Sequence, residues 1–446
     1  MAGITRPLIF PFSLSNSIFR SIDKKSVLHP MKKSIQPFGL QDNHLPFSGL
    51  TKPFSFSTSW IHDCCGNQVP VPNSGRGDIR KFMSMAGGSS SQMEKQCRDQ
   101  HDVIPGLRHT VWDQQDLRPK FPKIEKDESA DVVVVGAGIA GISCAYNLVK
   151  EGKSVVLLEA KTRGSGMSGR TTAHLMLWYD DFYFQLEKDH GFDIAKIVAE
   201  SHKRAIDFIE TTVKEEGIDC HFYRLDGYLF PHDNSTEAMD LLIKEFEACK
   251  RVRLDVKMVE LGNDPAYGKV GKAIQFPNSG EFHPLLYING VADAIVRRGG
   301  RIYEKSHVFE VEKNHVKTKD GVTVTAGAVV MATYSPLNHN LAVHARQTPN
   351  RTYVIGLKVP KGSVKRANWW DTYDPYHYVR LEQKVDYDVL IVGGEDTSSG
   401  MKPKDYHDPY AQLEKWTRER WTTAEEVLYR WTGQVFEPVD HLSYWT

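Results

Sequence analysis

The sequence predicts an α/β protein, because a short apolar run, a glycine-rich turn and an amphipathic segment follow one another within residues 131–159. The run Val132–Val135 is β-branched and uninterrupted, which is typical of a parallel strand buried on both faces. After the turn, apolar side chains recur at helical spacing from Ile139 to Val149, and a second apolar run follows at 154–158. This order of strand, turn, helix and strand indicates a parallel sheet covered by helices.

The turn carries glycines at the spacing that dinucleotide-binding folds use. The first permits a sharp turn, the second lets the backbone approach a pyrophosphate, and the third lets the helix pack closely on the strand. An acid, Glu159, ends the second strand, where a carboxylate accepts hydrogen bonds from ribose hydroxyls. The segment therefore predicts a Rossmann-type fold. The residues expected to contact the cofactor here are Gly136, Gly138, Ile139, Ala140, Gly141, Glu159 and Ala160.

The next segment helps to choose between cofactors. It reads RGSGMSGRTTAHL from Arg163 to Leu175, and its small and hydroxyl-bearing residues resemble the D-amino-acid oxidase and glycine oxidase superfamily of FAD-dependent oxidoreductases. In that superfamily the stretch wraps the pyrophosphate and the flavin edge. A nicotinamide-dependent enzyme with one Rossmann domain is the alternative. The resemblance implies FAD contacts at Gly166, Ser168, Gly169, Arg170, Thr171, Thr172 and Ala173.

Later segments carry the same resemblance. His283–Gly300 resembles a helix of the superfamily that is followed by a strand, here 301–305. The strand whose backbone contacts adenine would begin at Val308, and Ala332 and Thr333 would lie beside the FAD. Asp320-Gly321 indicates a hairpin turn between two alternating strands. The fold class that follows is a discontinuous, glutathione-reductase-like FAD-binding domain joined to an α+β substrate domain with a mixed or antiparallel sheet.

A narrower resemblance, in TTAHL, ATYSPL, DVLIVGGEDTSSG and EEVLYRWTGQVFEPVD, is to a subgroup whose members often carry a C-terminal Rieske iron–sulfur domain. That cluster needs paired Cys and His ligands, and none of the six cysteines has the required spacing. In the superfamily, a strand and a glycine-led helix after the EPVD element complete the flavin site. We therefore expect either a competent flavoprotein or a C-terminally truncated, inactive or non-catalytic form of one.

The expected cofactor domain comprises 129–190, 283–340 and 426–446, and its last strand lies near 426–434. The expected substrate domain comprises 191–282 and 341–425. The flavin would lie at the carboxyl ends of the parallel strands and face the second domain. The helices and strands predicted for the substrate domain are Asp193–Glu216, Glu237–Lys250, Cys220–Phe230, Thr352–Val359 and Val385–Val392.

The candidate substrate-binding residues lie on two predicted strands. Tyr376, Tyr378 and Arg380 would share one face of a strand, and Arg351 offers a second guanidinium on the strand before it. Arginine suits bidentate binding of a carboxylate, and the alternative is that these side chains face solvent at a sheet edge. The resemblance implies oxidation of a C–N bond of an amine or amino acid by hydride transfer to flavin, with oxygen or a protein as electron acceptor.

The composition of the chain bears on its possible partners. The chain has 446 residues, of which 40% are hydrophobic and 25% charged, with a net charge of zero, so nothing indicates a nucleic-acid partner. No apolar run approaches the roughly 18 residues of a membrane span. The histidines and cysteines show no metal-binding spacing.

The N-terminal part differs from the rest. Residues 1–85 are poor in acids and rich in serine and basic residues, which is typical of an organelle transit peptide, and chloroplast is favoured over mitochondrion. A cytoplasmic protein is the alternative if translation starts at Met83 or Met85. Residues 86–128 are predicted to be a polar linker that crosses the surface.

Overall fold

The computed structural model describes residues 60–62, 68–70, 110–112, 121–335, 337, 346–398 and 408–442. The chain divides into two compact units, one of Met1–Leu14 with Pro105–Thr446 and one of Ser15–Ile104. In the second unit, β1 (Trp60–His62) pairs antiparallel with β2 (Gln68–Pro70). The rest of the predicted transit segment, 1–85, lies outside the described residues. The predicted cofactor and substrate folds belong to the first unit.

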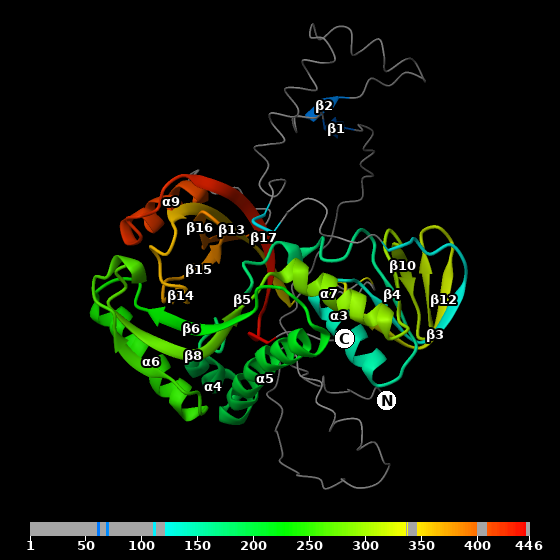
Figure 1. The fold of residues 1–446 in the computed structure, drawn as a ribbon, viewed down its shortest axis with the longest axis horizontal. Coiled ribbons are helices and arrows are strands. Elements are labelled where there is room, and N and C mark those ends of the chain that lie inside the picture. Colours follow the sequence, from blue (N-terminus) through cyan, green and yellow to red (C-terminus); the bar gives the residue numbers. More distant parts are fainter. Residues whose placement is uncertain are drawn as a thin grey trace, which may run out of the picture. The chain divides into compact units, whose positions relative to one another are not determined.

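A six-stranded sheet forms the predicted nucleotide fold, in the order β10-β11-β12-β3-β4-β9 (Figure 1). Four of its strands run parallel: β3 (Glu128–Val135), β4 (Val155–Leu158), β9 (Arg301–Tyr303) and β12 (Thr323–Met331). The antiparallel strands β10 (Val308–Val311) and β11 (His315–Thr318) extend it, and the hairpin turn predicted at Asp320-Gly321 joins β11 to β12. Helices α3 (Ile139–Lys150) and α7 (Pro284–Arg297) lie side by side next to this sheet.

Strand β3 is buried on both faces, as its valines predict. Val132 and Val134 pack in one hydrophobic cluster with α3 and α7, whereas Val133 and Val135 pack in another with Val156 and the β10–β12 strands. Burying the apolar side chains of both faces is the main source of stability for such a strand. The glycine turn at the carboxyl end of β3 is therefore attached to one of the most rigid parts of the fold.

The second sheet has nine strands, in the order β17-β13-β16-β15-β14-β6-β8-β5, with β7 beside β8. It is mixed, as expected, because β14 and β6 run parallel and the other pairs antiparallel. Its strands are β5 (His174–Leu175), β6 (Tyr223–Phe230), β7 (Lys257–Glu260), β8 (Lys272–Glu281), β13 (Gln347–Pro360), β14 (Asn368–Asp371), β15 (Tyr378–Gln383), β16 (Tyr387–Ser398) and β17 (Val427–Pro438).

The remaining helices are α4 (Tyr183–His190), α5 (Phe192–Glu216), α6 (Thr236–Arg251) and α9 (Pro409–Arg420). The helices predicted at 193–216 and 237–250 are thus present as α5 and α6. Helix α6 begins where Ser235 accepts a hydrogen bond from the Ala238 N–H, which satisfies one of its open first-turn donors. No described helix has the length and the apolar character needed to cross a membrane.

Two expectations about the fold are wrong. The last strand was predicted to join the cofactor sheet, but β17 pairs along its length with β13 in the nine-stranded sheet. The sequence pattern of a strand predicts that it is buried, but not which strand lies next to it. Trp431 of β17 nevertheless packs in the hydrophobic cluster of α3 and α7. The second error concerns the predicted linker, 86–128: its residues 110–112 belong to the core, because Val111 and Trp112 are 2% and 1% exposed, whereas most of 121–128 is exposed or half-buried. A tryptophan in a polar segment was the available signal.

Candidate cofactor and substrate site

The glycine turn after β3 leaves no room for side chains at two of its three positions. A Cβ on Gly136 would lie 2.4 Å from the Ala332 carbonyl oxygen, and its φ of 101° also favours glycine. A Cβ on Gly141 would lie 1.9 Å from the Gly136 carbonyl oxygen. The turn therefore brings β3, α3 and the end of β12 together as the sequence predicted.

The N-terminus of α3 is open toward a ligand. The N-cap residue of the helix is Gly138, which has no side chain to accept from the first N–H groups, and the first turn has no acidic residue. Ser168 Oγ accepts from the Ile139 N–H at 3.0 Å, which brings the segment after β4 to the same helix end. Open first-turn N–H groups and the positive end of the helix dipole favour a phosphate at this place.

Glu159 holds the turn together from the end of β4. Its Oε2 accepts from the Ala137 N–H at 2.8 Å, and its Oε1 accepts from the Lys161 N–H at 2.8 Å. The Glu159 carbonyl accepts from the Ser306 N–H at 2.8 Å, so the chain just before Val308 runs beside the backbone of Glu159. Val308 itself is buried with its side chain in a hydrophobic cluster. The arrangement fits the ribose and adenine end of a dinucleotide, and Ala160, which follows, is exposed.

The end of β12 closes the other side of the turn. The Ala332 N–H donates to the Val135 carbonyl at 2.8 Å, and Thr333 Oγ1 donates to the Ser335 carbonyl at 2.8 Å. Both residues therefore lie at the carboxyl end of β12, next to the end of its parallel neighbour β3. This cradle fits FAD: the turn from Gly136 to Gly141 would hold the pyrophosphate, and Glu159 the ribose.

The cofactor loop, residues 166–174, connects the nucleotide fold to the nine-stranded sheet. It begins with a 3-10 turn, Met167–Gly169, in which a Cβ on Gly169 would lie 2.3 Å from the Gly164 carbonyl oxygen. Gly166 and Thr171 are exposed, whereas Thr172 and Ala173 are buried. Arg170 Nη1 donates to the Thr432 carbonyl of β17 at 3.2 Å. The loop thus bridges the two sheets.

His174 ends the loop as a packed, neutral side chain. Its Nε2 donates to the Val379 carbonyl at 3.0 Å, so its Nδ1 is the nitrogen that accepts from the Thr172 hydroxyl at 2.9 Å. Burial, and secondly the nearby charge of Arg380, lower the pKa of His174 to about 3. Its ring packs against Trp370 and Tyr378.

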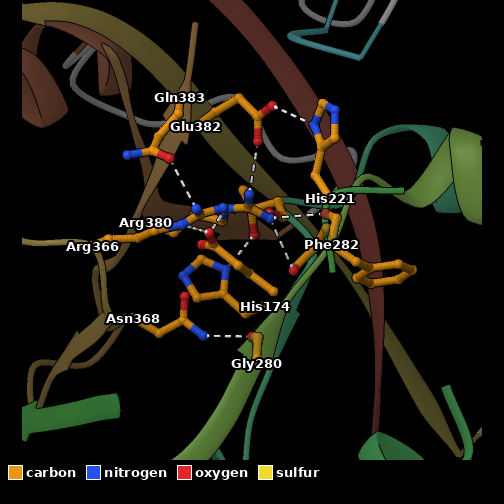
Figure 2. A network of polar contacts seen from close by, with 12 residues as sticks. His174, His221, Gly280, Phe282, Arg366, Asn368, Arg380, Glu382 and Gln383 are labelled. Atoms are coloured by element: carbon orange, nitrogen blue, oxygen red, sulfur yellow. Dashed lines mark hydrogen bonds and ion pairs between the residues drawn. The ribbon is translucent and has the colours of Figure 1, made fainter. Parts of the chain in front are cut away.

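Arg380 does not lie open to a substrate, so the carboxylate clamp predicted for it is contradicted. It is 1% exposed, and its Nη1 donates to the carbonyls of Thr172, Ala173 and Phe282 at 3.1–3.3 Å. Its Nη2 donates to Glu382 Oε2 at 2.9 Å, and its Nε lies 3.4 Å from Glu281 Oε2. Figure 2 shows the guanidinium at the centre of this network. Strand β15 is an inner strand of the sheet, which local sequence could not reveal.

The two predicted tyrosines lie near the cofactor loop with their hydroxyls occupied. Tyr378 OH and Thr352 Oγ1 are 2.6 Å apart, and the Tyr378 ring is edge-on to His174. Tyr376 OH donates to Asp180 Oδ2 at 3.1 Å. The rings of the two tyrosines are 5.8 Å apart, so together they form an aromatic wall beside the loop.

Arg351 is the predicted cation that stays available. It is half-buried on β13, opposite Thr397 of β16 and Gln434 of β17. No hydrogen bond or ion pair joins its guanidinium to another part of the described chain. Arg351 shares its face of β13 with Tyr353, so the structure does not bring it together with Tyr378, which meets Thr352 on the other face.

Asp396 is a site residue that the sequence reasoning missed, although it lies in the stretch DVLIVGGEDTSSG. It precedes Thr397 on β16, and its Oδ1 is buried without a hydrogen-bond partner among the described residues. Burial, opposed by a hydrogen bond with Thr352, raises the pKa of Asp396 to about 6. A carboxyl group whose pKa lies this close to neutral pH is a candidate for proton transfer.

Two further features lie away from these residues. A hollow of about 520 Å³ is lined by His221, Gln383, Lys384, Val385, Tyr387 and Tyr429. None of the predicted site residues lines it, so we attach no chemistry to it. On the β10–β11 hairpin, Glu310, Glu312 and His315 bring their ligand atoms within 4.8 Å of one another, at a partly exposed place.

Comparison with known proteins agrees with this geometry. Residues 131–444 match the family described as FAD dependent oxidoreductase. The putative Rieske 2Fe-2S iron-sulfur protein YhfW of Bacillus subtilis is 27% identical over 341 residues, which are 75% of this chain and 65% of that protein. This chain therefore spans slightly less than two thirds of that relative.

The names of two other similar proteins include an activity. Gamma-glutamylputrescine oxidoreductase of Escherichia coli is 30% identical over 322 residues, or 70% of this chain and 75% of that protein. The crystal structure of glycine oxidase from Geobacillus kaustophilus superposes with a TM-score of 0.58 at 18% identity, covering 71% of this chain and 85% of that one. The second likeness shows the fold alone. None of these comparisons supports the nicotinamide-dependent alternative.

Proposed function

Because the chain belongs to the family of FAD-dependent oxidoreductases, we propose that it oxidises a C–N bond of an amine or amino acid. FAD, when bound, supplies the acceptor for a hydride from the carbon next to nitrogen, which leaves an imine for hydrolysis, and the electrons pass on to oxygen or a protein acceptor. The observation that carries the proposal is the cofactor loop, which runs from the glycine cradle to the aromatic wall of Tyr376 and Tyr378.

Two side chains would handle the substrate. Arg351 is not one of them, because it shares its face of β13 with Tyr353, whereas Thr352 meets Tyr378 on the other face. Asp396 Oδ1 would accept a hydrogen bond from the substrate ammonium group and take its proton, because an amine must be neutral to release a hydride easily. Tyr378, held by Thr352, would pack against the substrate and exclude water.

The names of the relatives support an amine or amino-acid substrate without selecting one. Gamma-glutamylputrescine oxidoreductase and glycine oxidase act, by their names, on substrates with a C–N bond. The location of the protein is also a proposal: the composition of residues 1–85 supports an organelle, with chloroplast favoured. A fluorescent protein fused after residue 85 would be directed to that organelle, and a diffuse cytoplasmic signal would contradict the proposal.

The first experiment is a visible absorption spectrum of the purified chain, followed by release of the cofactor with acid. We expect flavin bands at close to one FAD per chain, and bleaching of those bands when an amine or amino-acid substrate is added without oxygen. A colourless protein would favour the non-catalytic alternative. A yellow protein that no amine or amino acid bleaches would contradict the proposed reaction but not the cofactor.

A further inference from the structure

Four consecutive carbonyls of the cofactor loop accept hydrogen bonds from side chains of distant segments. The Arg170 carbonyl accepts from Trp431 Nε1 at 2.8 Å. The next carbonyl, of Thr171, accepts from Trp112 Nε1 at 2.7 Å. The carbonyls of residues 172 and 173 accept from Arg380 Nη1 at 3.3 and 3.1 Å. The three donors come from the segment before the nucleotide fold, from β17 and from β15.

Trp112 is fixed in place by its own surroundings. It is 1% exposed, its ring lies 5.2 Å from the Arg380 guanidinium carbon, and its edge contacts His283 at the start of α7. Its backbone N–H donates to Thr110 Oγ1 at 3.3 Å. The segment 110–112 is therefore part of the core on which the cofactor loop rests.

The loop needs such support because it has little regular structure of its own. Its last residues are buried, and buried carbonyls outside helices and sheets must find other donors. Ala173 also has a φ of 62°, a left-handed conformation that an alanine adopts only when its surroundings impose it. Removing one donor would leave a carbonyl of the loop without its partner and let the loop relax.

We propose that Trp112, Arg380 and Trp431 form a carbonyl clamp that keeps the cofactor loop in the shape that binds FAD. Trp112 is then a cofactor-positioning residue supplied by the segment that precedes the nucleotide fold. This proposal assumes that FAD is the cofactor, but it does not depend on which substrate is oxidised.

The test is Trp112→Phe in the full chain, which keeps an aromatic ring but removes the N–H donor. Trp421→Phe is the matched control, because Trp421 is fully buried and its Nε1 has no partner among the described residues. We expect Trp112→Phe to weaken FAD binding about five- to tenfold, as the loss of one partly buried hydrogen bond does. It should also change the visible circular dichroism of the bound flavin. Trp421→Phe should leave both unchanged. Equal FAD affinities for wild type and Trp112→Phe would overturn the clamp.

Hydrogen exchange in the FAD-free protein gives a second, independent readout. We expect Trp112→Phe to speed amide exchange in residues 170–174, with no change in β3 or α3, while Trp421→Phe leaves the loop as in wild type. This measurement decides the proposal even if the chain retains no FAD or oxidises no amine. Unchanged exchange in the loop, or the same acceleration throughout the fold, would overturn the clamp.

Discussion

The carboxyl edge of the six-stranded sheet and the inner face of the nine-stranded sheet build their sites in different ways. At the first, the contacts are local: Ala137 and Glu159 are 22 positions apart, and Ile139 and Ser168 are 29 apart. At the second, they are distant: Arg380 and the Thr172 carbonyl are 208 positions apart. A site of the first kind follows from one stretch of sequence, whereas a site of the second kind exists only after the sheets have formed.

Two arginines on the second sheet sharpen this difference. The sequence offers Arg380 first and Arg351 second for the same role, since each lies two residues from a tyrosine. The structure surrounds Arg380 with Glu281 and Glu382, and leaves Arg351 open. A buried cation paired with carboxylates supports the fold, whereas an open one is available for a ligand.

The largest expected effect is on stability, from Arg380→Met. Removing the guanidinium leaves buried carboxylates and carbonyls unpaired, which costs about 3–5 kcal/mol of unfolding free energy. Arg351→Met is the control, and we expect it to cost less than about 0.5 kcal/mol. Urea unfolding of both variants measures the difference. Equal losses would mean that the two arginines are both structural.

The next effect concerns the glycine cradle. Gly141→Ala places a Cβ 1.9 Å from the Gly136 carbonyl oxygen, so the turn must open. We expect a loss of about 1–3 kcal/mol and a large loss of FAD affinity, measured by thermal unfolding and flavin titration. Gly166→Ala is the matched control, because nothing lies within 4 Å of its Cβ position. If Gly166→Ala lost FAD at unchanged stability, the cofactor would contact that residue directly.

At the proposed substrate site we expect a loss of turnover without a loss of stability. Asp396→Asn should leave FAD affinity unchanged but lower kcat about a hundredfold, because a positioned general base contributes about 10²–10⁴-fold. Arg351→Gln, on the other face of β13, is the matched control and should leave kcat and KM unchanged. An unchanged kcat in Asp396→Asn would remove Asp396 from proton transfer.

The sequence predicted the first region almost completely and the second only in outline. The glycine turn, Glu159 and the helices and strands around them follow from local spacing, and each is present where expected. The pairing of β17 with β13 and the burial of Trp112 depend on contacts between segments at least 59 residues apart, which no local pattern encodes. Arg380 was found as a residue but given the wrong role, because its partners Glu281 and Thr172 lie on other segments.

The last prediction separates the two regions by pH, beginning with the acid side. Glu216 joins α5 to α3 and α7 through Tyr146, Arg297 and Arg298. Burial would raise the pKa of Glu216, but the hydrogen bonds from Arg298, Tyr146 and Arg297 outweigh it and lower the pKa to about 2. Its stabilisation is therefore present above the ordinary value of 4.5 and is lost as the pH falls toward 2.

The alkaline side concerns His377, which lies between Asp371 and Glu395 on the second sheet at 2.8 and 3.2 Å. Burial would lower the pKa of His377, but the hydrogen bonds to both carboxylates raise it above its ordinary 6.5. Its stabilisation is complete below 6.5 and is lost as the pH rises through the higher folded value. Hydrogen exchange, corrected for intrinsic rates, should show α5 loosening first in acid and β14–β16 loosening first in alkali. Glu216→Gln should abolish the acid response and His377→Gln the alkaline one. If either variant changed both responses, the two regions would unfold as one unit. They would then differ in how their sites are built along the sequence, but not in stability.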